Sequence, residues 1–396
     1  MGKEIVLGLG DNIDYEIRWD SSIMEQLVRE YGISAGELST GKEIKTLRDL
    51  LVSILGFMEK NSGGERFVHN AEIIEAFSDR FEKKITLGGT AVRAAIAMKK
   101  LGYSSGVHLV TMNEHVKRLL PEDCEWLCSS TLESSYPHLI VQFRAGDAVH
   151  AKDIHIETSR ANRIIYTNDP DNARMRLHPG LGSLLEDAKV FLISGFNAMN
   201  DPGLLKERLA ELREILKTIP EDTAVFFEDG CYHVPKLSGI VREYLLPYIC
   251  IYSLNEDEFE GYAGRPVSWT CAGAVTGALK DLHEIIPAPV FVVHTRHWAL
   301  AYGENPGKYK KALLGGVTMA TSRFRFGDDF TREDYEETGR LPPEEEGKIF
   351  AAEIEEAAGG KICCVPSFLV SEKNVTTIGL GDTFAGGFLP ALIGHV

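Results

Sequence analysis

The chain of 396 residues contains no run of 18 apolar residues, and its opening segment, Met1 to Leu7, does not resemble a secretion signal. Both absences argue against a membrane span or export, so we expect cytoplasmic localisation. The seven cysteines form no CxxC pair and are odd in number. This disfavours a zinc knuckle and a complete disulfide framework, and we expect free thiols.

Positive charge is also scarce. The chain has 42 Lys and Arg residues against 58 Asp and Glu residues, which gives a net charge of −16. Such a surface repels nucleic acids and anionic membranes, so we expect neither as a partner. A small anionic substrate is compatible with this charge only where arginines or lysines are clustered locally.

What the sequence does contain is a repeated alternation of strand and helix patterns. Apolar strand-like segments and amphipathic helical segments follow one another with short connections. This order predicts a mainly parallel sheet with helices on both faces, a three-layer α/β/α domain that binds its ligands beyond the carboxyl ends of the strands. The predicted strands are 4–9, 107–110, 190–194, 224–228, 248–252 and 290–294, and the predicted helices include 203–217, 236–246, 255–262 and 268–285.

Two regions depart from this alternation. Segments 13–19 and 138–168 are rich in β-branched and aromatic residues and have no nearby helical pattern, which predicts a small β-rich lid. We therefore assign 1–12, 41–137 and 169–396 to the α/β core and 13–40 and 138–168 to the lid. The acidic segment 327–346 is expected to form solvated surface.

The strongest local motif is Gly379-Leu380-Gly381-Asp382, followed by the apolar, helix-compatible segment Thr383–Phe388. The glycines allow a close approach of the backbone to a ligand, and unpaired N–H groups at a helix start bind anions. A carboxylate beside those groups can accept a proton from an attacking hydroxyl. The motif therefore predicts a phosphoryl-transfer centre with Asp382 as the base. The alternative is an aspartate that only caps a helix.

The same four letters occur at Gly8-Leu9-Gly10-Asp11. That copy follows the first predicted strand and leads into Asn12-Ile13-Asp14 instead of a helix. We therefore assign no catalytic role to Asp11.

With these motifs, the chain resembles the ribokinase-like superfamily and, more narrowly, the ADP-dependent phosphofructokinase and glucokinase family. The resemblance runs from Asn12-Ile13-Asp14 through nearly the whole chain to Asp382. It includes the diglycine Gly88-Gly89, the NxxE pattern of Asn255 and Glu258, the strand end Val293-His294-Thr295, the tail Val365-Pro366-Ser367 and the segment Ile378 to Thr383.

The resemblance implies roles for these residues. Sugar binding falls on Asn12, Asp14, Gly88 and Gly89, and the anion hole on Gly379, Leu380, Gly381 and Asp382. Magnesium is expected on Glu228, Glu258 and Asn255, held through water. Nucleotide contacts fall on His294, Thr295 and Val365.

Two positions depart from the family pattern. Relatives carry His-x-Glu at the end of a sheet strand, whereas this chain has Phe226-Phe227-Glu228. Thr90 stands after the diglycine, where an amide residue is expected. The first departure affects the metal and phosphate site, and the second affects the choice of sugar.

The resemblance implies an ADP-dependent sugar kinase that releases AMP, with Mg²⁺ as cofactor and ADP as co-substrate. The arginines Arg174 and Arg176, with Arg160 and Arg163 nearby, favour a phosphorylated acceptor, fructose 6-phosphate, over glucose. Two alternatives stay open. One is an ATP-dependent sugar or nucleoside kinase of the same superfamily, and the other is a catalytically weak regulator that binds sugar or nucleotide.

Overall fold

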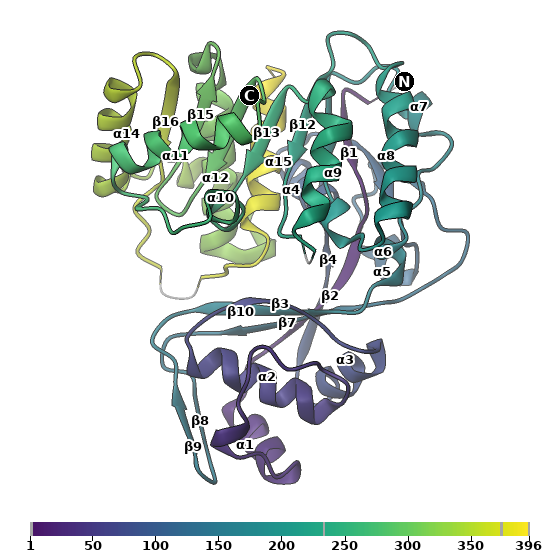
Figure 1. Cartoon of the computed structure of the whole chain (residues 1–396), viewed down its shortest axis with the longest axis vertical. Helices are drawn as coiled ribbons and strands as arrows, with labels where there is room; N and C mark the ends of the chain where they lie inside the picture. The colour runs from purple at the N-terminus through teal and green to yellow at the C-terminus, as the bar shows by residue number, and fades with distance from the viewer. Residues whose placement is uncertain (1–2, 233, 373–374, 395–396) are drawn as a thin grey trace.

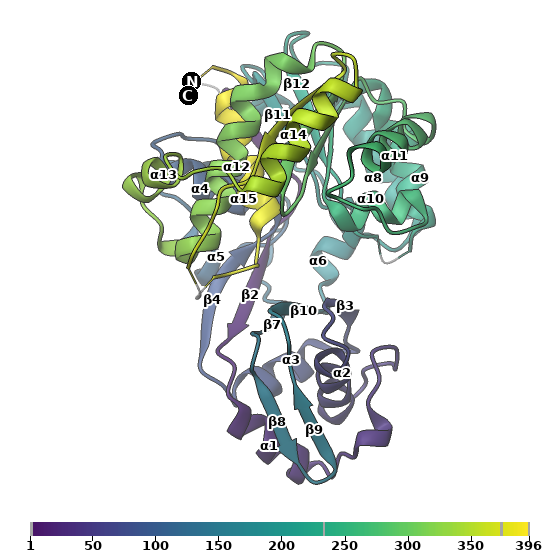
Figure 2. The ribbon, with the colours of Figure 1, turned by 90° about the vertical axis from the view of Figure 1, so that its left-hand side faces the viewer.

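The computed structural model describes residues 3–232, 234–372 and 375–394. It has a large lobe built on a nine-stranded sheet and a small lobe built on a five-stranded sheet (Figure 1). Strands β2 and β4 and helix α6 (Pro170–Ala173) lie where the lobes meet (Figure 2). No helix among the described residues combines the length and apolar character needed to cross a membrane.

The large sheet is parallel over seven strands, and β15 runs antiparallel to both of its neighbours. The strand order from edge to edge is β16 (Ile362–Pro366), β15 (Trp298–Gly303), β14 (Val290–His294), β13 (Ile251–Leu254), β12 (Ala224–Glu228), β11 (Val190–Ile193), β1 (Ile5–Gly8), β5 (Gly106–Leu109) and β6 (Glu125–Cys128). The central strands are apolar and buried on both faces, as a covered parallel sheet requires.

Helices cover both faces of this sheet and give two separate apolar cores. One face carries α7 (Leu181–Leu184), α8 (Pro202–Leu216), α9 (Lys236–Leu245), α10 (Glu256–Ala263), α11 (Ala272–Ile285) and α14 (Glu345–Ala357). The other carries α4 (Thr90–Lys100), α5 (Glu114–Leu119), α12 (Lys310–Phe326) and α15 (Leu380–Leu392), with α13 (Arg332–Thr338) beside α12. The predicted three-layer α/β/α architecture is confirmed.

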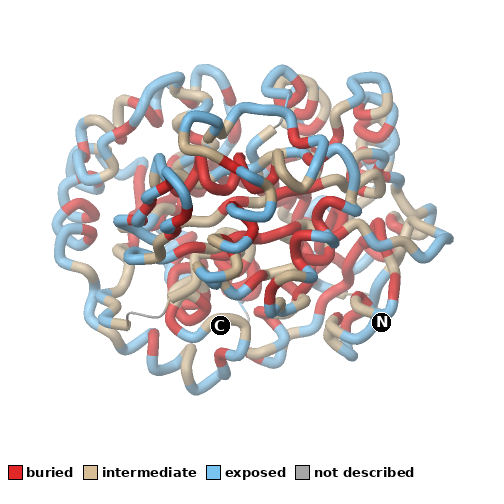
Figure 3. The backbone as a smooth tube through the Cα atoms, turned by 90° about the horizontal axis from the view of Figure 1, so that it is seen from below, coloured by how far each residue is buried: buried red, intermediate tan, exposed pale blue. Residues whose placement is uncertain are grey.

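The small lobe has its own core between its sheet and three helices. The sheet order is β3 (Gly64–Phe67), β10 (Asn162–Thr167), β7 (His138–Phe143), β2 (Asn12–Ile17) and β4 (Lys83–Gly88). The helices are α1 (Ser21–Glu30), α2 (Leu47–Glu59) and α3 (Ala71–Ser78), and a hairpin of β8 (Ala148–Ala151) and β9 (Ile154–Glu157) packs beside them. Figure 3 shows this lobe from below, with buried segments in red between exposed ones.

This arrangement corrects the expected division of the chain. Segment 41–88 was assigned to the α/β core, but its helices α2 and α3 and strands β3 and β4 belong to the small lobe. The reason is packing: Leu50, Ile54 and Phe77 are fully buried against the face of the five-stranded sheet that carries Val141. The two helices were predicted correctly, but the sheet against which they pack was not.

The acidic segment 327–346 also differs from the expectation. It contains the short helical turn Gly327–Asp329 and helix α13, and it buries Phe330 and Thr338. Asp328 is part of an ion-pair network with three cations, Lys84, Arg93 and Arg323.

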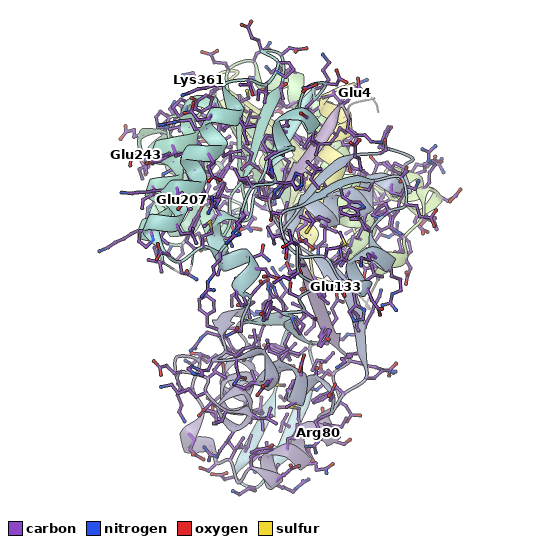
Figure 4. The ribbon with its side chains drawn as sticks, turned by 90° about the vertical axis from the view of Figure 1, so that its right-hand side faces the viewer. Glu4, Arg80, Glu133, Glu207, Glu243 and Lys361 are labelled. Atoms are coloured by element: carbon purple, nitrogen blue, oxygen red, sulfur yellow. The ribbon has the colours of Figure 1, made fainter. Side chains whose placement is uncertain are left out.

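The remaining short helical turns are Ala35–Glu37, Phe196–Ala198, Leu246–Tyr248 and Pro306–Tyr309. Elsewhere charged side chains such as Glu207 and Glu243 cover the outer surface (Figure 4).

Candidate active site

The candidate site lies where the parallel strands of the large sheet end, on the side that faces the small lobe (Figure 1). Strands β12, β13 and β14 end at Glu228, Leu254 and His294, and β1 leads directly into β2 of the small lobe. Parallel strands bring their carboxyl ends to one edge. Residues from distant parts of the chain therefore meet here.

Helix α15 begins at this edge with the predicted glycine motif. Gly379 precedes the helix with φ of 62°, a left-handed conformation that favours glycine. The backbone N–H groups of Leu380, Gly381 and Asp382 come before the first intrahelical hydrogen bond, which Thr383 N donates to Gly379 O. The first turn of α15 thus presents free amides beside the carboxylate of Asp382, the combination that an anion hole with a base requires.

Two residues of α4 contact the Asp382 carboxylate. Thr90 Oγ1 donates a hydrogen bond to Asp382 Oδ1 at 2.8 Å, and Arg93 Nε lies 3.8 Å from Asp382 Oδ2. Thr90, which follows the diglycine, thus contacts the candidate base. The sequence analysis did not identify Arg93, although an arginine among alanines in the first half of a predicted helix was a visible signal.

The residues expected to bind sugar lie next to this pair. Asp14 is buried and accepts hydrogen bonds from Asn12 Nδ2 at 2.6 Å and from Arg93 Nη2 at 2.6 Å. A side chain at Gly88 would collide with Asn12 and Asp14, and Gly89 has φ of 91° with its backbone close to Asp11. The diglycine therefore leaves room for the Asn12–Asp14 pair, and Asp14 is linked to Asp382 through Arg93.

A buried pair lies on the other side of the α15 N-terminus. His294 Nε2 donates to Glu228 Oε1 at 2.9 Å, and a Cβ added to Gly381 would be 3.2 Å from the His294 ring and 3.9 Å from that carboxylate. Burial lowers the pKa of His294, but attraction to Glu228 and other carboxylates outweighs it and raises the pKa. Phe226, where the sequence resemblance implies a histidine, is fully buried and packs against Phe388.

Asn255 and Glu258 form the helix-start pair of α10. Asn255 Oδ1 accepts from the backbone N–H groups of Asp257 and Glu258, and Glu258 Oε2 accepts from Asn255 N at 2.8 Å. Burial raises the pKa of Glu258 to about 7 despite that amide hydrogen bond, and the Glu228 carboxylate contributes to the increase. The Asn255 side chain is thus occupied as a helix cap, while Glu258 keeps a carboxylate near Glu228.

These carboxylates fit a divalent cation held through water. Glu228 Oε2 is buried and has no hydrogen-bond partner among the described residues, and a nearby cation would stabilise both it and Glu258 in their ionised forms. Within residues 3–232, 234–372 and 375–394, no group of three or more His, Cys, Asp or Glu side chains is arranged to hold a metal directly. The described residues therefore offer no all-protein cage, and a cation at Glu228 and Glu258 would take further ligands from water.

The other expected nucleotide contacts lie nearby in the turn and strand beyond His294. Thr295 Oγ1 donates to Trp298 O at 2.8 Å and accepts from Trp298 N, so its hydroxyl holds the turn between β14 and β15. Val365 is buried in β16 and its side chain belongs to the core beneath α12 and α15. The register pairs Ala299 with both His294 and Val365, so Thr295 and Val365 both lie near the sheet edge where β12 ends at Glu228.

The four arginines occupy different places. Arg174 and Arg176 are exposed just after α6, at the junction of the lobes (Figure 2). Arg163 pairs with Gln142, which puts it on the same face of the small sheet as Asp14, because residues two apart along a strand share a face. Arg160 is exposed and donates to Asn61 O at 3.1 Å, away from that face.

His138 is a further residue that the sequence analysis missed. It is the cross-strand neighbour of Asp14, and its Nε2 donates to Asp169 Oδ2 at 3.1 Å. Burial lowers the pKa of His138, but the Asp169 carboxylate outweighs burial and raises it. A histidine that opens a β-strand carries no motif, so only the pairing of β7 with β2 shows its position.

A cavity of about 700 Å³ opens between the lobes beside the α15 N-terminus. Its lining includes Glu16, Lys84 and Gln142 from the small lobe and Thr376 and Ile378 from the large lobe. Ile378 immediately precedes Gly379. The lining of this cavity therefore extends to the residue that precedes the Gly379–Asp382 motif but does not include the motif itself.

The second Gly-x-Gly-Asp motif is structural in this fold. Asp11 is buried and its Oδ1 accepts from the backbone N–H groups of Val110 at 2.7 Å and Thr111 at 3.0 Å. Burial raises the pKa of Asp11 to about 7, against the lowering effect of those two hydrogen bonds. Asp11 thus ties the crossover into the small lobe to the end of β5.

Solved structures share this fold over almost the whole chain. A phosphofructokinase from Pyrococcus horikoshii OT3 with AMP has a TM-score of 0.77 at 19% identity, covering 99% of this chain and 98% of that one. An ADP-dependent kinase complex with fructose-6-phosphate and ADPbetaS has a TM-score of 0.74 at 15% identity, covering 99% and 95%. At these identities the likeness establishes the fold, which is ribokinase-like.

Sequence comparisons identify the family. The ADP-specific phosphofructokinase of Thermococcus zilligii is 25% identical over 63% of this chain and 60% of its own length, and that of Pyrococcus abyssi (strain GE5 / Orsay) is 22% identical over 95% and 94%. The family model described as the ADP-specific Phosphofructokinase/Glucokinase conserved region matches residues 3–264. The chain therefore belongs to the ADP-specific phosphofructokinase/glucokinase family, whose members are phosphotransferases that act on sugar hydroxyls.

Proposed function

We propose that this protein is an ADP-dependent sugar kinase that phosphorylates a hexose or hexose phosphate, favours fructose 6-phosphate over glucose, and releases AMP. The observation that carries the proposal is the position of Asp382, which lies beside the free amides of α15 and is linked through Arg93 to Asp14. The names of the curated relatives, both ADP-specific phosphofructokinases, support the same donor and acceptor class.

In the proposed reaction, an acceptor hydroxyl oxygen attacks the β-phosphorus of ADP. The bond between that phosphorus and the oxygen bridging to the α-phosphorus breaks, and AMP leaves with the bridging oxygen. Asp382 takes the proton of the hydroxyl. The amides of Leu380, Gly381 and Asp382 stabilise the charge on the transferred group, which is the main requirement of phosphoryl transfer.

The metal and sugar ligands follow from the same arrangement. Glu228, Glu258 and, through water, Asn255 would hold Mg²⁺, which neutralises phosphate charge when it is bound. Asn12 and Asp14 would bind acceptor hydroxyls, with Gly88 and Gly89 shaping the pocket. His294, Thr295 and Val365 stay proposed nucleotide contacts.

Fructose 6-phosphate is favoured because a phosphate needs local cations in a protein of net charge −16. Arg163 shares the sheet face of Asp14, and Arg174 and Arg176 are exposed at the junction of the lobes. An arginine fork binds phosphate in a bidentate manner. These three arginines are the proposed acceptor-phosphate ligands.

The small lobe is proposed to act as a lid. Its polar sheet face, which carries Asp14, Glu16 and His138, turns toward the α15 N-terminus. Closure over the acceptor would exclude water and so suppress hydrolysis of ADP. We propose that the protein works in the cytoplasm.

A donor and acceptor screen tests this function. Purified protein is incubated with ADP, ATP or pyrophosphate, Mg²⁺, and a panel of hexoses and hexose phosphates, and AMP release and sugar phosphate are quantified. We expect turnover with ADP and highest kcat/KM for fructose 6-phosphate. Turnover with ATP alone would indicate the ATP-dependent alternative, and ADP binding without turnover on any sugar would indicate a regulator.

A further inference from the structure

The first turn of helix α4 makes two contacts with the candidate base. Thr90 and Arg93 are three residues apart, a spacing that places both on one side of a helix. Thr90 Oγ1 donates to Asp382 Oδ1 at 2.8 Å, and Arg93 Nε lies 3.8 Å from Asp382 Oδ2. Each carboxylate oxygen of Asp382 therefore has its own partner from the same turn.

Arg93 is unusual within its helix. The other buried residues of α4 are alanines, Val92 and Met98, whereas Arg93 places a guanidinium with 4% side-chain exposure between α4 and α15. A buried cation is costly unless carboxylates surround it. Here they do: Asp14 lies at 2.6 Å, Glu16 at 3.4 Å and Asp328 at 3.9 Å.

Arg93 also packs closely against the backbone of Gly379, the residue that precedes the anion hole. Gly379 has φ of 62°, and a Cβ added there would lie 2.8 Å from Arg93 Cδ and 3.0 Å from Arg93 Nη1. Arg323, which shares Asp328 with Arg93, donates from Nε to Ile378 O at 2.7 Å. Two buried arginines therefore lie against the residues that precede α15. Arg93 packs against Gly379, and Arg323 hydrogen-bonds to Ile378.

We propose that Thr90 and Arg93 are positioning residues that set the orientation of the Asp382 carboxylate, and that Arg93 also fixes the distance between this base and the acceptor-binding Asp14. The proposal rests on the proposed function and deepens it. A base must lie within hydrogen-bond reach of the proton that it removes, and small misplacements are costly. One rigid guanidinium that contacts both carboxylates ties the acceptor to the base.

Lysine cannot replace the arginine in this role. A guanidinium presents donors from a planar fork in fixed directions, whereas an ammonium is a single point of charge. Arg93→Lys therefore keeps the buried charge but cannot reach Asp14 and Asp382 together. Thr90→Val keeps the shape of the side chain and removes only the hydroxyl donor.

The test is a set of double-mutant cycles on kcat with ADP and the preferred sugar. We expect Thr90→Val and Arg93→Lys each to lower kcat by about 10- to 100-fold, the cost of a misplaced catalytic group, with ADP affinity in calorimetry unchanged. Arg93→Lys should also raise KM for the sugar. In an Asp382→Asn background neither change should lower kcat further, because both act through that carboxylate.

Matched controls separate positioning from folding. Arg48→Lys changes a partly buried arginine of the small lobe that binds a carbonyl and a glutamate, and Thr318→Val changes another buried threonine, both outside the site. Both should leave kcat unchanged. The proposal is overturned if Thr90→Val keeps normal kcat, or if its loss persists in full in the Asp382→Asn background.

Failure of the proposed function would look different, because the wild-type protein would then turn over no sugar. In that case the Thr90–Asp382 cycle is measured on the urea unfolding midpoint. Coupling between the two changes supports the positioning contact, and strict additivity overturns it.

Discussion

His294 Nε2 lies 2.9 Å from Glu228 Oε1, and this buried pair joins β14 to β12 across the intervening strand β13. The His294 ring also stacks on Phe384 of α15, with ring centroids 4.8 Å apart. A histidine therefore contacts Glu228 from β14, and not from the strand that carries Glu228 itself. Phe226, at the motif position, serves only the core.

This pair leads to a prediction on metal dependence. Glu228→Gln removes a proposed ligand charge, and His294→Phe removes the partner that orients it. Loss of such an orienting partner typically weakens metal binding about 10- to 100-fold. We expect both variants to raise the Mg²⁺ concentration for half-maximal rate, measured by titration at saturating ADP. Glu260→Gln, on the same helix as Glu258 but bonded to Val267 and Trp269, is the control. An unchanged Mg²⁺ dependence would assign Glu228 to structure.

Asp382→Asn should remove the base and leave nucleotide binding intact. We expect turnover to fall by about 10²- to 10⁴-fold, the range for loss of a general base. Stopped assays of AMP release and calorimetry with ADP measure the two effects separately. Asp11→Asn, in the second copy of the motif, should keep near-normal turnover per folded molecule. Near-normal turnover of Asp382→Asn would make Asp382 a helix cap.

The acceptor-phosphate arginines are tested through KM. A charged hydrogen bond to phosphate contributes about 1.5–3 kcal/mol, so Arg163→Ala, Arg174→Ala or Arg176→Ala should raise KM for fructose 6-phosphate by about 10- to 150-fold. ADP affinity should barely change. Arg160→Ala is the control, because Arg160 contacts Asn61 outside the sheet face of Asp14. Normal KM in all three variants would place the phosphate site elsewhere.

Asp328 should be important for stability. It pairs with Arg323, Arg93 and Lys84, and removing one partner of a buried ion pair costs about 3–5 kcal/mol. Burial would raise the pKa of Asp328, but these cations outweigh burial and hold it well below its usual range. The stabilisation is therefore present above the unfolded pKa of about 3.9 and is lost as pH falls through the folded pKa.

Urea unfolding of Asp328→Asn measures this effect. We expect a lower midpoint than wild type at pH 7, and a difference that shrinks only as pH falls below about 3.9. Asp329→Asn is the matched control, because the Asp329 side chain is 94% exposed and lies 4.0 Å from Lys84. Equal midpoints for the Asp328 and Asp329 variants would contradict the prediction.

Asp11 should give the opposite pH dependence. Burial raises its pKa to about 7 in the folded protein, whereas an unfolded aspartate titrates near 3.9. The stability contributed by the neutral form is complete below about pH 4 and is lost as pH rises through 7. The asparagine of the Asp11→Asn variant cannot ionise. The urea midpoint of this variant should therefore rise relative to that of wild type as the pH increases from 5 to 8. A constant difference across this range would show that Asp11 does not titrate there.

The sequence by itself determined that the large lobe is an α/β layer structure, and it predicted the sheet edge at which ligands would bind. The apolar strands, the amphipathic helices and the short connections are local patterns, and a parallel sheet follows from their alternation. It also distinguished Asp382 from Asp11, because only Asp382 leads into a helix. Both results depend on neighbouring residues alone.

Only the tertiary structure decided which elements share a core and which side chains meet. Helices α2 and α3 were expected in the α/β core because their periodicity does not say which sheet they cover. The contacts of the site join residues far apart in the chain: 292 positions separate Thr90 from Asp382, 79 separate Asp14 from Arg93, and 66 separate Glu228 from His294. Such pairs form when strand ends converge, and no local pattern encodes that convergence.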